Sequence, residues 1–349
     1  MKELESERLM KNTSNIIHNT SMQVKLSIVV PIYNVEQYIA PCLDSLYQQD
    51  IPESEYEVIC VNDASPDGSR EIVKEYQTKH KNLILVEHEK NMKLGAARNT
   101  GRRIAQGEYI WNVDSEDLIV PNCLKKMLEI CDRDELDVLM FGVRRLWNGK
   151  LYDRDVKLWD ESASVSTGLN FWKAQGEKNK RYISPVWTQV FRKEFMDAEH
   201  IYSPEINMGE DVPYTFSAIL LSNRMKAINM PCYIYRDNTE SLTGVLRKHP
   251  NPKAVYENSF VCSAYMYWLQ QKMQQRHKDI LKSINSITKH IIVLYTYYVL
   301  MLSKEEKQVF LSLCRKNYFK NLFVYKVLNK RQGLEYTKFI ITGKEPQYK

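Results

Sequence analysis

The feature that most constrains the fold is a regular alternation, between residues 26 and 113, of short apolar runs with segments of helical periodicity. The apolar runs are rich in β-branched residues and predict buried strands at 26–31, 56–63, 83–87 and 109–113. Helical spacing between them predicts helices around 41–47, with Pro41 in the first turn, and over 69–79 and 95–105. This alternation predicts an α/β fold with a mostly parallel sheet and helices on both faces.

Two aspartates stand where predicted strands end. Asp63 closes the second apolar run, and Asp114 directly follows the fourth. Ligands of open α/β sheets bind at the carboxyl ends of the strands, so position alone nominates both residues for ligand binding. The carboxylate of Asp63 can accept a hydrogen bond from a nucleobase N–H. Its structural alternative is to cap the loop that follows.

The densest chemical signal is the run Asp114-Ser115-Glu116-Asp117, three carboxylates within four residues. Like charges this close repel each other unless a cation lies between them, and clustered oxygens suit Mg²⁺ or Mn²⁺ together with substrate phosphates. Ordinary turn or capping chemistry at Asp117 is an equally good interpretation of the run by itself.

Two further charged sites, Arg98 and the Glu210-Asp211 pair, are candidates for a role in the reaction. Arg98 lies in the small-residue stretch 95–101, where a backbone can approach a ligand closely, and its forked cation matches a diphosphate. An ordinary surface arginine is the alternative. Glu210 and Asp211 precede a predicted helix start, where a carboxylate can act as general base toward a sugar hydroxyl or simply cap the helix.

Taken together, these segments resemble a family 2 glycosyltransferase, a group of inverting enzymes that use nucleotide-diphosphate sugars on a GT-A fold, a Rossmann-like sheet. Seven segments match in the family's order, over residues 26 to 245. They are LSIVVPIYN (26–34), YEVICVNDASPDGSR (56–70), NMKLGAARNTG (91–101), GEYIWNVDSEDLIVP (107–121), PVWTQVFRKEFM (185–196), GEDVPYTF (209–216) and PCYIYRDNTES (231–241).

The resemblance implies a role for each candidate residue. Pro31, Tyr33 and Asp63 match positions that line a uridine-type base pocket, and Arg98 matches a residue near the nucleotide diphosphate. The nucleotide-sugar site also takes in Asp114 and Ser115.

The family's DXD motif falls on Asp114 and Glu116, which implies a Mg²⁺ or Mn²⁺ site. Asp211 matches the catalytic base, with Glu210 beside it. Two residues depart from the pattern, because the family usually has Asp at Glu116 and at Asn62. The QxxRW motif of processive members is absent from the sequence, which favours addition of a single sugar.

The chain is predicted to divide into three parts. Residues 1–24 form a polar leader, with Met22 as an alternative start, and residues 25–250 form the transferase domain, with nucleotide binding in 25–120 and the acceptor and base part in 121–250. Residues 251–349 form a basic helical region that holds 17 Lys and Arg against 6 Asp and Glu. This excess suggests peripheral contact with an anionic membrane, or equally a solvated helical surface.

The absence of a secretory signal and of a run of about 20 apolar residues predicts a cytoplasmic protein. The seven cysteines form no CxxC pair and are expected to be small buried residues. The predicted partners are a nucleotide-sugar donor and a glycan or lipid-linked acceptor in cell-surface polysaccharide synthesis, with no nucleic acid, since the basic half contains no recognisable module.

Two rival functions stand beside this one. A sugar-1-phosphate nucleotidyltransferase would need a Gly-rich phosphate loop after the first strand, but Pro31 begins a segment without glycine until Gly68. A degenerate, non-catalytic binding module is the other alternative, with Glu116 as the sign of a lost metal.

Overall fold

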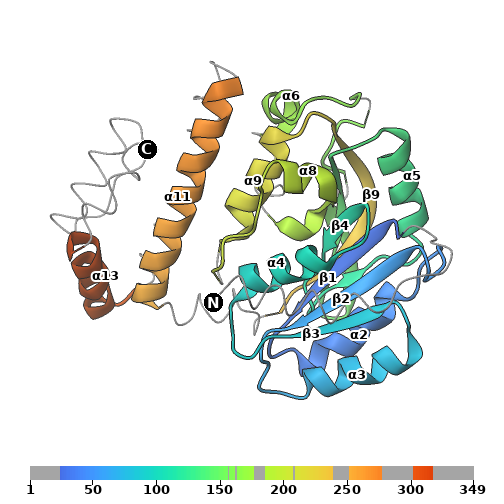
Figure 1. Ribbon diagram of the computed structural model, residues 1–349, viewed down its shortest axis with the longest axis horizontal. Coiled ribbons are helices and arrows are strands. Elements are labelled where there is room, and N and C mark those ends of the chain that lie inside the picture. Colours follow the sequence, from blue (N-terminus) through green and yellow to red (C-terminus); the bar gives the residue numbers. More distant parts are fainter. Residues whose placement is uncertain are drawn as a thin grey trace, which may run out of the picture.

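One mixed sheet forms the centre of the structure, with helices on both of its faces (Figure 1). The structure is a computed structural model, and it describes residues 24–155, 157–161, 163–176, 185–206, 209–238, 251–276 and 302–316. Within these residues the sheet has nine strands in the order β3-β2-β1-β4-β8-β6-β9-β5, with β7 paired to β6.

The first half of the sheet is parallel, as predicted. It contains β1 (Leu26–Ile32), β2 (Tyr56–Asn62), β3 (Leu83–Glu87) and β4 (Tyr109–Asn112). β1 lies between β2 and β4, with Ile32 opposite Asn62 and Val29 opposite Asn112. All residues of β1, β2 and β4 are buried, which explains why these strands appear in the sequence as continuous apolar runs.

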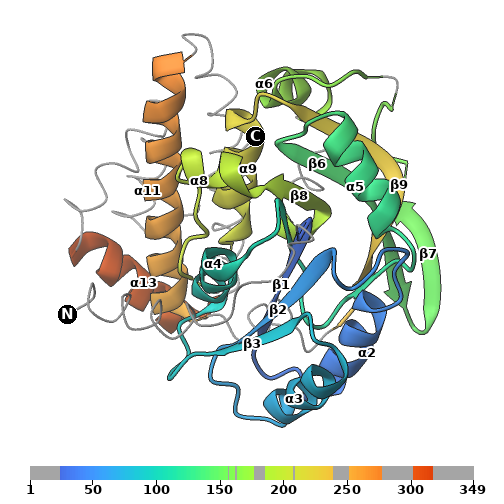
Figure 2. The ribbon, with the colours of Figure 1, turned by 45° about the vertical axis from the view of Figure 1, so that its right-hand side comes forward.

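The second half of the sheet mixes directions. β8 (Gln189–Arg192) runs antiparallel to both β4 and β6 (Val138–Trp147), and β9 (Met225–Arg236) runs parallel to β6. The short strand β5 (Leu118–Ile119) pairs antiparallel with β9. β6 and β7 (Lys150–Asp155) form an antiparallel hairpin at the side of the molecule (Figure 2). β9 therefore lies between β6 and β5, and it contacts the segment that follows β4 in the chain.

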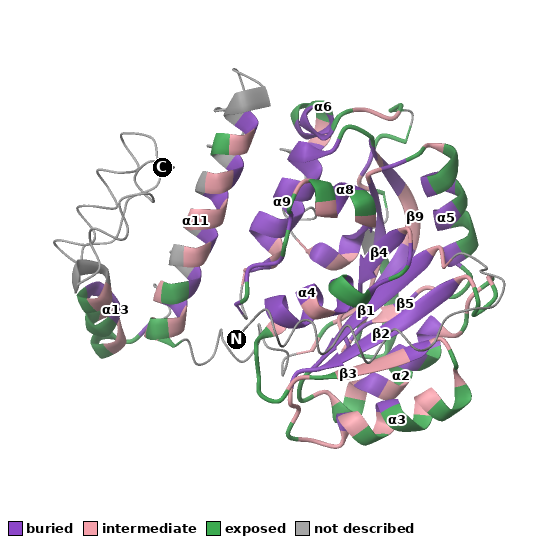
Figure 3. Cartoon of the chain, viewed as in Figure 1, coloured by how far each residue is buried: buried purple, intermediate pink, exposed green. Residues whose placement is uncertain are grey.

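Helices cover both faces of the parallel half, as predicted. Alternate residues of a strand point to opposite faces, so Ile28 and Val30 join the core under α2 (Glu36–Leu46) and α3 (Ser69–Lys79). Val29 belongs to a smaller cluster on the other face, together with Ala97 of α4 (Leu94–Ile104). β1, β2 and β4 are wholly buried between these layers, whereas β3 at the edge of the sheet is only partly buried (Figure 3).

The prediction that Pro41 lies in the first turn of its helix is wrong. α2 begins at Glu36, so Pro41 lies inside the helix. The earlier start is fixed by the neighbouring loop, because the backbone N–H of Glu36 donates to Asp67 and the Glu36 carboxylate accepts from the N–H of Gly68. These tertiary contacts outweigh the local preference of proline for a first turn.

The small residues of α4 serve close packing inside the protein. A Cβ placed on Gly95 would lie 1.7 Å from the carbonyl oxygen of Pro204, and one on Gly101 would lie 2.4 Å from a methyl group of Val29. The close approach expected for this stretch is therefore made to the protein's own chain. It brings α4 against β1 and against the segment that leads to α9 (Asp211–Leu221).

A second hydrophobic core lies under α9. Every residue of α9 after Asp211 is buried, which makes it an internal helix rather than an amphipathic one. Two C-terminal helices contribute side chains to this core: α11 (Pro252–Arg276), which stands beside α9 in Figure 1, and α13 (Lys304–Lys316). The remaining elements are α5 (Leu124–Arg133), α6 (Gly168–Phe171), η1 (Trp172–Gly176), η2 (Val186–Thr188) and α8 (Lys193–Ala198).

The C-terminal region is helical where the structure describes it, in α11 and α13. The rest of this predicted region lies outside the described residues, as does almost all of the predicted leader. Six cysteines are described as free and buried, in line with the prediction. Among the described helices, none combines the length and apolar character that a membrane span requires.

Candidate functional site

The carboxyl ends of β1, β2 and β4 form one edge of the sheet, and the candidate residues gather along it. Asp63, just past β2, is 3% exposed, and its two carboxylate oxygens accept hydrogen bonds from the backbone N–H groups of Met92 (2.7 Å) and Lys93 (2.8 Å). His88 Nδ1 lies 2.7 Å from the same carboxylate. Asp63 therefore fixes the loop that leads into α4.

This loop contains a strained backbone. Lys93 has φ +81° and ψ 160°, a region that is usually reserved for glycine, and it immediately precedes α4. Its N–H is held by Asp63 and by the side chain of Asn91. The capping alternative for Asp63 is thus realised, although on the loop 88–93. Nucleobase binding by the same carboxylate stays a prediction.

A buried arginine joins the two acidic segments. Arg98 of α4 is 4% exposed, and its guanidinium donates from Nη2 to Asp114 (2.9 Å) and from Nη1 to Glu210. Asp114 follows β4 and Glu210 precedes α9, and these two segments are far apart in sequence. Arg98 is therefore an internal counter-ion, and its surface-arginine alternative does not hold. Contact with a diphosphate remains a prediction.

The buried charges of this cluster shift the pKa values of Arg98 and Asp211. Burial acts to lower the pKa of Arg98, but the carboxylates of Asp114, Glu210 and Asp211 outweigh it, so the pKa lies above its ordinary value. Burial, followed by repulsion from Glu210, raises the pKa of Asp211 well above that of an ordinary aspartate, even though Arg98 opposes the shift. Asp211 is thus a stronger base than an ordinary aspartate.

Capping does not explain the Glu210-Asp211 pair. Glu210 occupies the N-cap position of α9 but makes no side-chain capping hydrogen bond, because its carboxylate is turned to Arg98. Asp211 is half-buried at the first position of the helix. The general-base interpretation therefore retains the half-buried carboxylate of Asp211, whose neighbour Glu210 is tied to Asp114 through Arg98.

The acidic turn 114–117 is anchored by β9. The backbone N–H of Asp114 donates to the hydroxyl of Tyr233 (3.2 Å), and that hydroxyl donates to Asp117 (2.7 Å). Asp117 is 1% exposed and also accepts from the N–H of Arg236 (2.7 Å). Burial, and then the charge of Asp114, raise the pKa of Asp117 far above its usual value. Asp117 is therefore a structural anchor of the turn.

Glu116 is the member of the turn whose titration lies near neutrality. Burial first, and repulsion from Asp114 second, raise its pKa to about 7, while a hydrogen bond from Asn238 Nδ2 (2.8 Å) works against them. Such a shift is expected of a partly buried carboxylate that lies close to another carboxylate.

The donor set of the turn fits a hard divalent cation that shares its coordination with a substrate. Among the described residues, no group of three His, Cys, Asp or Glu side chains could hold a metal by itself. Mg²⁺ needs only one or two protein carboxylates when substrate phosphates supply further oxygens. Glu116 and Asp114 offer such a pair, since the bond from Arg98 uses only Oδ1 of Asp114.

The remaining candidates lie on the same edge of the sheet. Pro31 is buried within β1, Tyr33 is 49% exposed just beyond it, and Ser115 is 7% exposed in the acidic turn. Among the described residues, no hydrogen bond or ion pair joins Pro31 or Tyr33 to Arg98. An exposed tyrosine at a strand end is available for stacking on a planar ring.

Sequence reasoning missed the anchors on β9 and beyond it. Tyr233, Arg236 and Asn238 hold the acidic turn through Asp117 and Glu116. All three lie in the segment PCYIYRDNTES, whose family match carried no roles for its residues. The pairing of Arg98 with Glu210 was missed as well. The sequence shows only a lone arginine in a helix of small residues, and this pattern does not indicate which carboxylate the arginine contacts.

Comparisons with known proteins agree with the fold and the order of these segments. The family model described as "Glycosyl transferase family 2" matches residues 27–192. An uncharacterized glycosyltransferase, EpsJ of Bacillus subtilis, is 34% identical over 222 residues, which cover 63% of this chain and 63% of EpsJ.

Two relatives carry more specific names. The poly(ribitol-phosphate) beta-N-acetylglucosaminyltransferase TarS of Staphylococcus aureus is 31% identical over 73% of this chain. A poly(ribitol-phosphate) beta-glucosyltransferase of Bacillus spizizenii is 41% identical over 55% of this chain. The matched segments span 42% of TarS and 32% of the Bacillus enzyme, so more than half of each relative lies outside its match to this chain.

The solved structure of S. aureus TarS residues 1–349 in complex with UDP-GlcNAc has a similar fold. Its TM-score is 0.57 at 22% sequence identity, over 90% of this chain and 92% of the TarS chain. The predicted GT-A architecture is thus confirmed.

Proposed function

The chain belongs to glycosyl transferase family 2 through residues 27–192, and on this premise we propose that it is an inverting glycosyltransferase that uses a UDP-sugar. The observation that carries the proposal is the buried Arg98, which brings Asp114 after β4 and the Glu210-Asp211 pair before α9 to one place. A donor-side carboxylate and a candidate base thereby share one site at the carboxyl edge of the sheet.

The donor half of the proposal rests on the strand ends. Tyr33 presents an exposed ring after β1, and Pro31 and Asp63 lie on the two adjacent strand ends. TarS, which shares this fold, has been solved in complex with UDP and with UDP-GlcNAc. We therefore assign the nucleotide to the edge between Tyr33 and Asp114.

A Mg²⁺ or Mn²⁺ ion, held by Asp114 and Glu116 together with the donor diphosphate, would stabilise the negative charge of the leaving group. The protein's own contribution here is geometric. Tyr233 and Asn238 fix the turn on which both carboxylates lie, and Arg98 fixes the orientation of Asp114.

Proton transfer is assigned to Asp211. Its half-buried carboxylate has a pKa raised by burial and by Glu210, which makes it a stronger base than an ordinary aspartate. In the proposed reaction it takes the proton of the acceptor hydroxyl. That oxygen forms a bond to the anomeric carbon while the bond from this carbon to the diphosphate breaks, so the configuration inverts. The acceptor is a hydroxyl of a glycan or lipid-linked polymer of the cell surface.

Donor binding can be tested by thermal shift of the purified chain against nucleoside diphosphates, each with and without Mn²⁺ or Mg²⁺. We expect UDP to stabilise the protein in a metal-dependent way, by about 2.7 kcal/mol at a hundredfold excess over its Kd. Glu116→Gln should remove the metal dependence, because it removes one charged ligand, whereas Glu205→Gln, at an exposed position, should not. An unchanged metal response in Glu116→Gln refutes the ligand assignment. A lack of response to every nucleotide favours the non-catalytic binding module.

We also propose that the basic C-terminal region holds the enzyme at the inner face of the cell membrane, near a lipid-linked acceptor. The 17 basic against 6 acidic residues beyond position 250 support this, since each Lys or Arg near an anionic surface contributes about 1 kcal/mol. The full chain should sediment with phosphatidylserine vesicles at low salt and be released at high salt. Failure to sediment at low salt rules the proposal out.

A further inference from the structure

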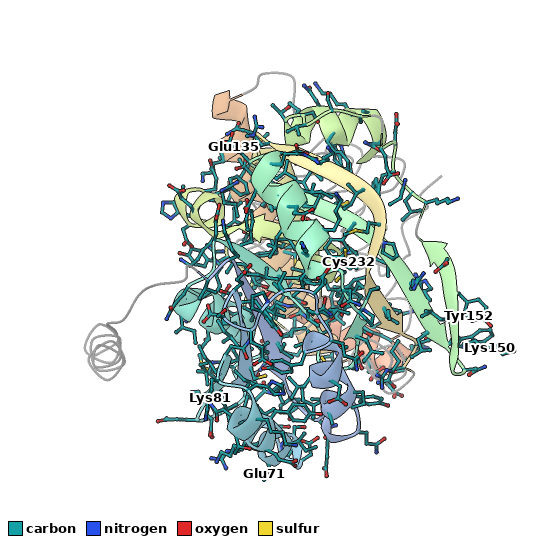
Figure 4. All side chains as sticks on the ribbon, turned by 90° about the vertical axis from the view of Figure 1, so that its right-hand side faces the viewer. Glu71, Lys81, Glu135, Lys150, Tyr152 and Cys232 are labelled. Carbon is teal, nitrogen blue, oxygen red and sulfur yellow. The ribbon has the colours of Figure 1, made fainter. Side chains whose placement is uncertain are left out.

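The β6–β7 hairpin carries large aromatic side chains on its surface. Trp147 is 53% exposed and Tyr152 is 41% exposed, and their ring centroids lie 6.3 Å apart. Tyr152 and Lys150 project from the outer end of the hairpin, away from Cys232 in the centre of the molecule (Figure 4). Neighbouring exposed aromatic residues of this size are typical of a binding surface.

The strand register places these aromatic residues on one face with the anchor of the acidic turn. Val143 of β6 lies opposite Tyr233 of β9, and Arg145 lies opposite both Tyr235 of β9 and Tyr152 of β7. Residues that are directly opposite each other project to the same face, and so do every second residue along a strand. Trp147 therefore shares this face.

Ring contacts make the face continuous. Trp187 stacks on Tyr233 with 4.4 Å between centroids, and it stacks on Tyr235 at 5.4 Å. The guanidinium of Arg145 lies 5.4 Å from the centre of the Tyr235 ring. We call the set Trp187, Tyr235, Arg145, Tyr152 and Trp147 the aromatic stripe. It begins at Trp187, which stacks on the buried Tyr233 whose hydroxyl holds Asp114 and Asp117, and it ends at the hairpin tip.

We infer that the aromatic stripe binds the acceptor polymer beyond the hydroxyl that reacts. The inference rests on the proposed function and extends it to the chemical class of the acceptor, a hydroxyl-rich chain of sugars or polyols. Flat ring faces bordered by polar groups are the usual lining of sites for such amphipathic ligands. The charged residues along the face are Arg145 and Lys150, with Asp237 beyond the end of β9.

The dimensions favour a chain over a single sugar. Trp147 lies four residues beyond Val143, which corresponds to about 13 Å along the strand. A ligand that reaches from Trp187 to the hairpin tip must therefore contain more than one sugar or polyol unit. The opposite face of the hairpin differs in character, because it carries Leu151 and an ion pair between Arg144 and Asp153 (2.7 Å).

The test uses the full chain with Trp147→Ala and Tyr152→Ala, and Leu151→Ala as the matched control. Leu151 is 47% exposed on the same hairpin but opposes Leu146, outside the stripe. Migration is measured in native gels that contain either poly(ribitol phosphate) or dextran. We expect at least one polymer to retard the wild type and Leu151→Ala, and we expect each stripe variant to bind it about tenfold more weakly.

Three outcomes overturn the inference: no retardation of the wild type by either polymer, equal retardation of all four proteins, or a change of oligomeric state in the stripe variants alone. The last outcome would assign the face to a second copy of the chain. The UDP thermal shift, measured on the same samples, reports on the proposed function separately. A normal UDP shift without polymer binding refutes only the role of the aromatic stripe. Polymer binding without any UDP shift refutes only the proposed sugar transfer.

Discussion

Asp211→Asn should lower the rate of sugar transfer by about 10²–10⁴-fold while leaving UDP binding close to that of the wild type. The amide keeps the size of the side chain but cannot accept the proton of the acceptor hydroxyl. The variant should also fold normally. Burial and repulsion from Glu210 disfavour the charged form of Asp211, so loss of its charge relieves the cluster.

The measurement is the incorporation of labelled sugar into an acceptor preparation on which the wild type is active, with UDP binding followed by thermal shift. Glu205→Gln removes an exposed carboxylate six positions earlier and should behave as the wild type does. If Asp211→Asn retains more than about a tenth of the activity, the base is another group, because general-base loss costs at least about 10²-fold.

Among the single variants named here, Arg98→Met should lower the free energy of unfolding the most. It leaves Glu210, with a side chain 5% exposed, and Asp114 without the cation that both contact. Breaking a buried pair by removal of one partner costs about 3–5 kcal/mol, because the remaining charge is uncompensated. Chemical unfolding of the variant should therefore show a midpoint well below that of the wild type.

Two further variants separate the loss of charge from the loss of packing. Arg103→Met makes the same change at an exposed position of the same helix and should be almost neutral. The double variant Arg98→Met with Glu210→Gln should recover part of the lost stability, since it removes the unpaired buried charge. If Arg98→Met unfolds at the same midpoint as the wild type, Arg98 is not the internal counter-ion described above.

Local pattern was sufficient to predict the parallel half of the sheet. β1, β2 and β4 are buried on both faces and therefore appear as apolar runs, and Asp63 and Asp114 could be placed at strand ends by position alone. The predicted helices over 69–79 and 95–105 agree with α3 and α4 within one residue at each end.

Long-range contacts could not be predicted in this way. Arg98 and Glu210 are 112 residues apart, and nothing in the helix around Arg98 specifies which carboxylate it meets. Pro41 was misplaced because Asp67 and Gly68 of another loop fix the start of α2. The roles of Tyr233 and Asn238 depend on β9 lying beside β5, and single-strand periodicity does not encode that pairing.

The position of β9 in the chain also determines when the site becomes complete during synthesis. Tyr233 is translated 116 residues after Asp117, which at about 5–20 residues per second corresponds to roughly 6–23 s on the ribosome. In that interval the strands of the parallel half have been translated, but the acidic turn lacks the hydrogen bonds from Tyr233, Arg236 and Asn238. A nascent chain interrupted before β9 would keep the strands of the parallel half and lack the residues that hold Glu116 and Asp117 in place. We therefore expect a chain released before β9 to lack the proposed transfer activity.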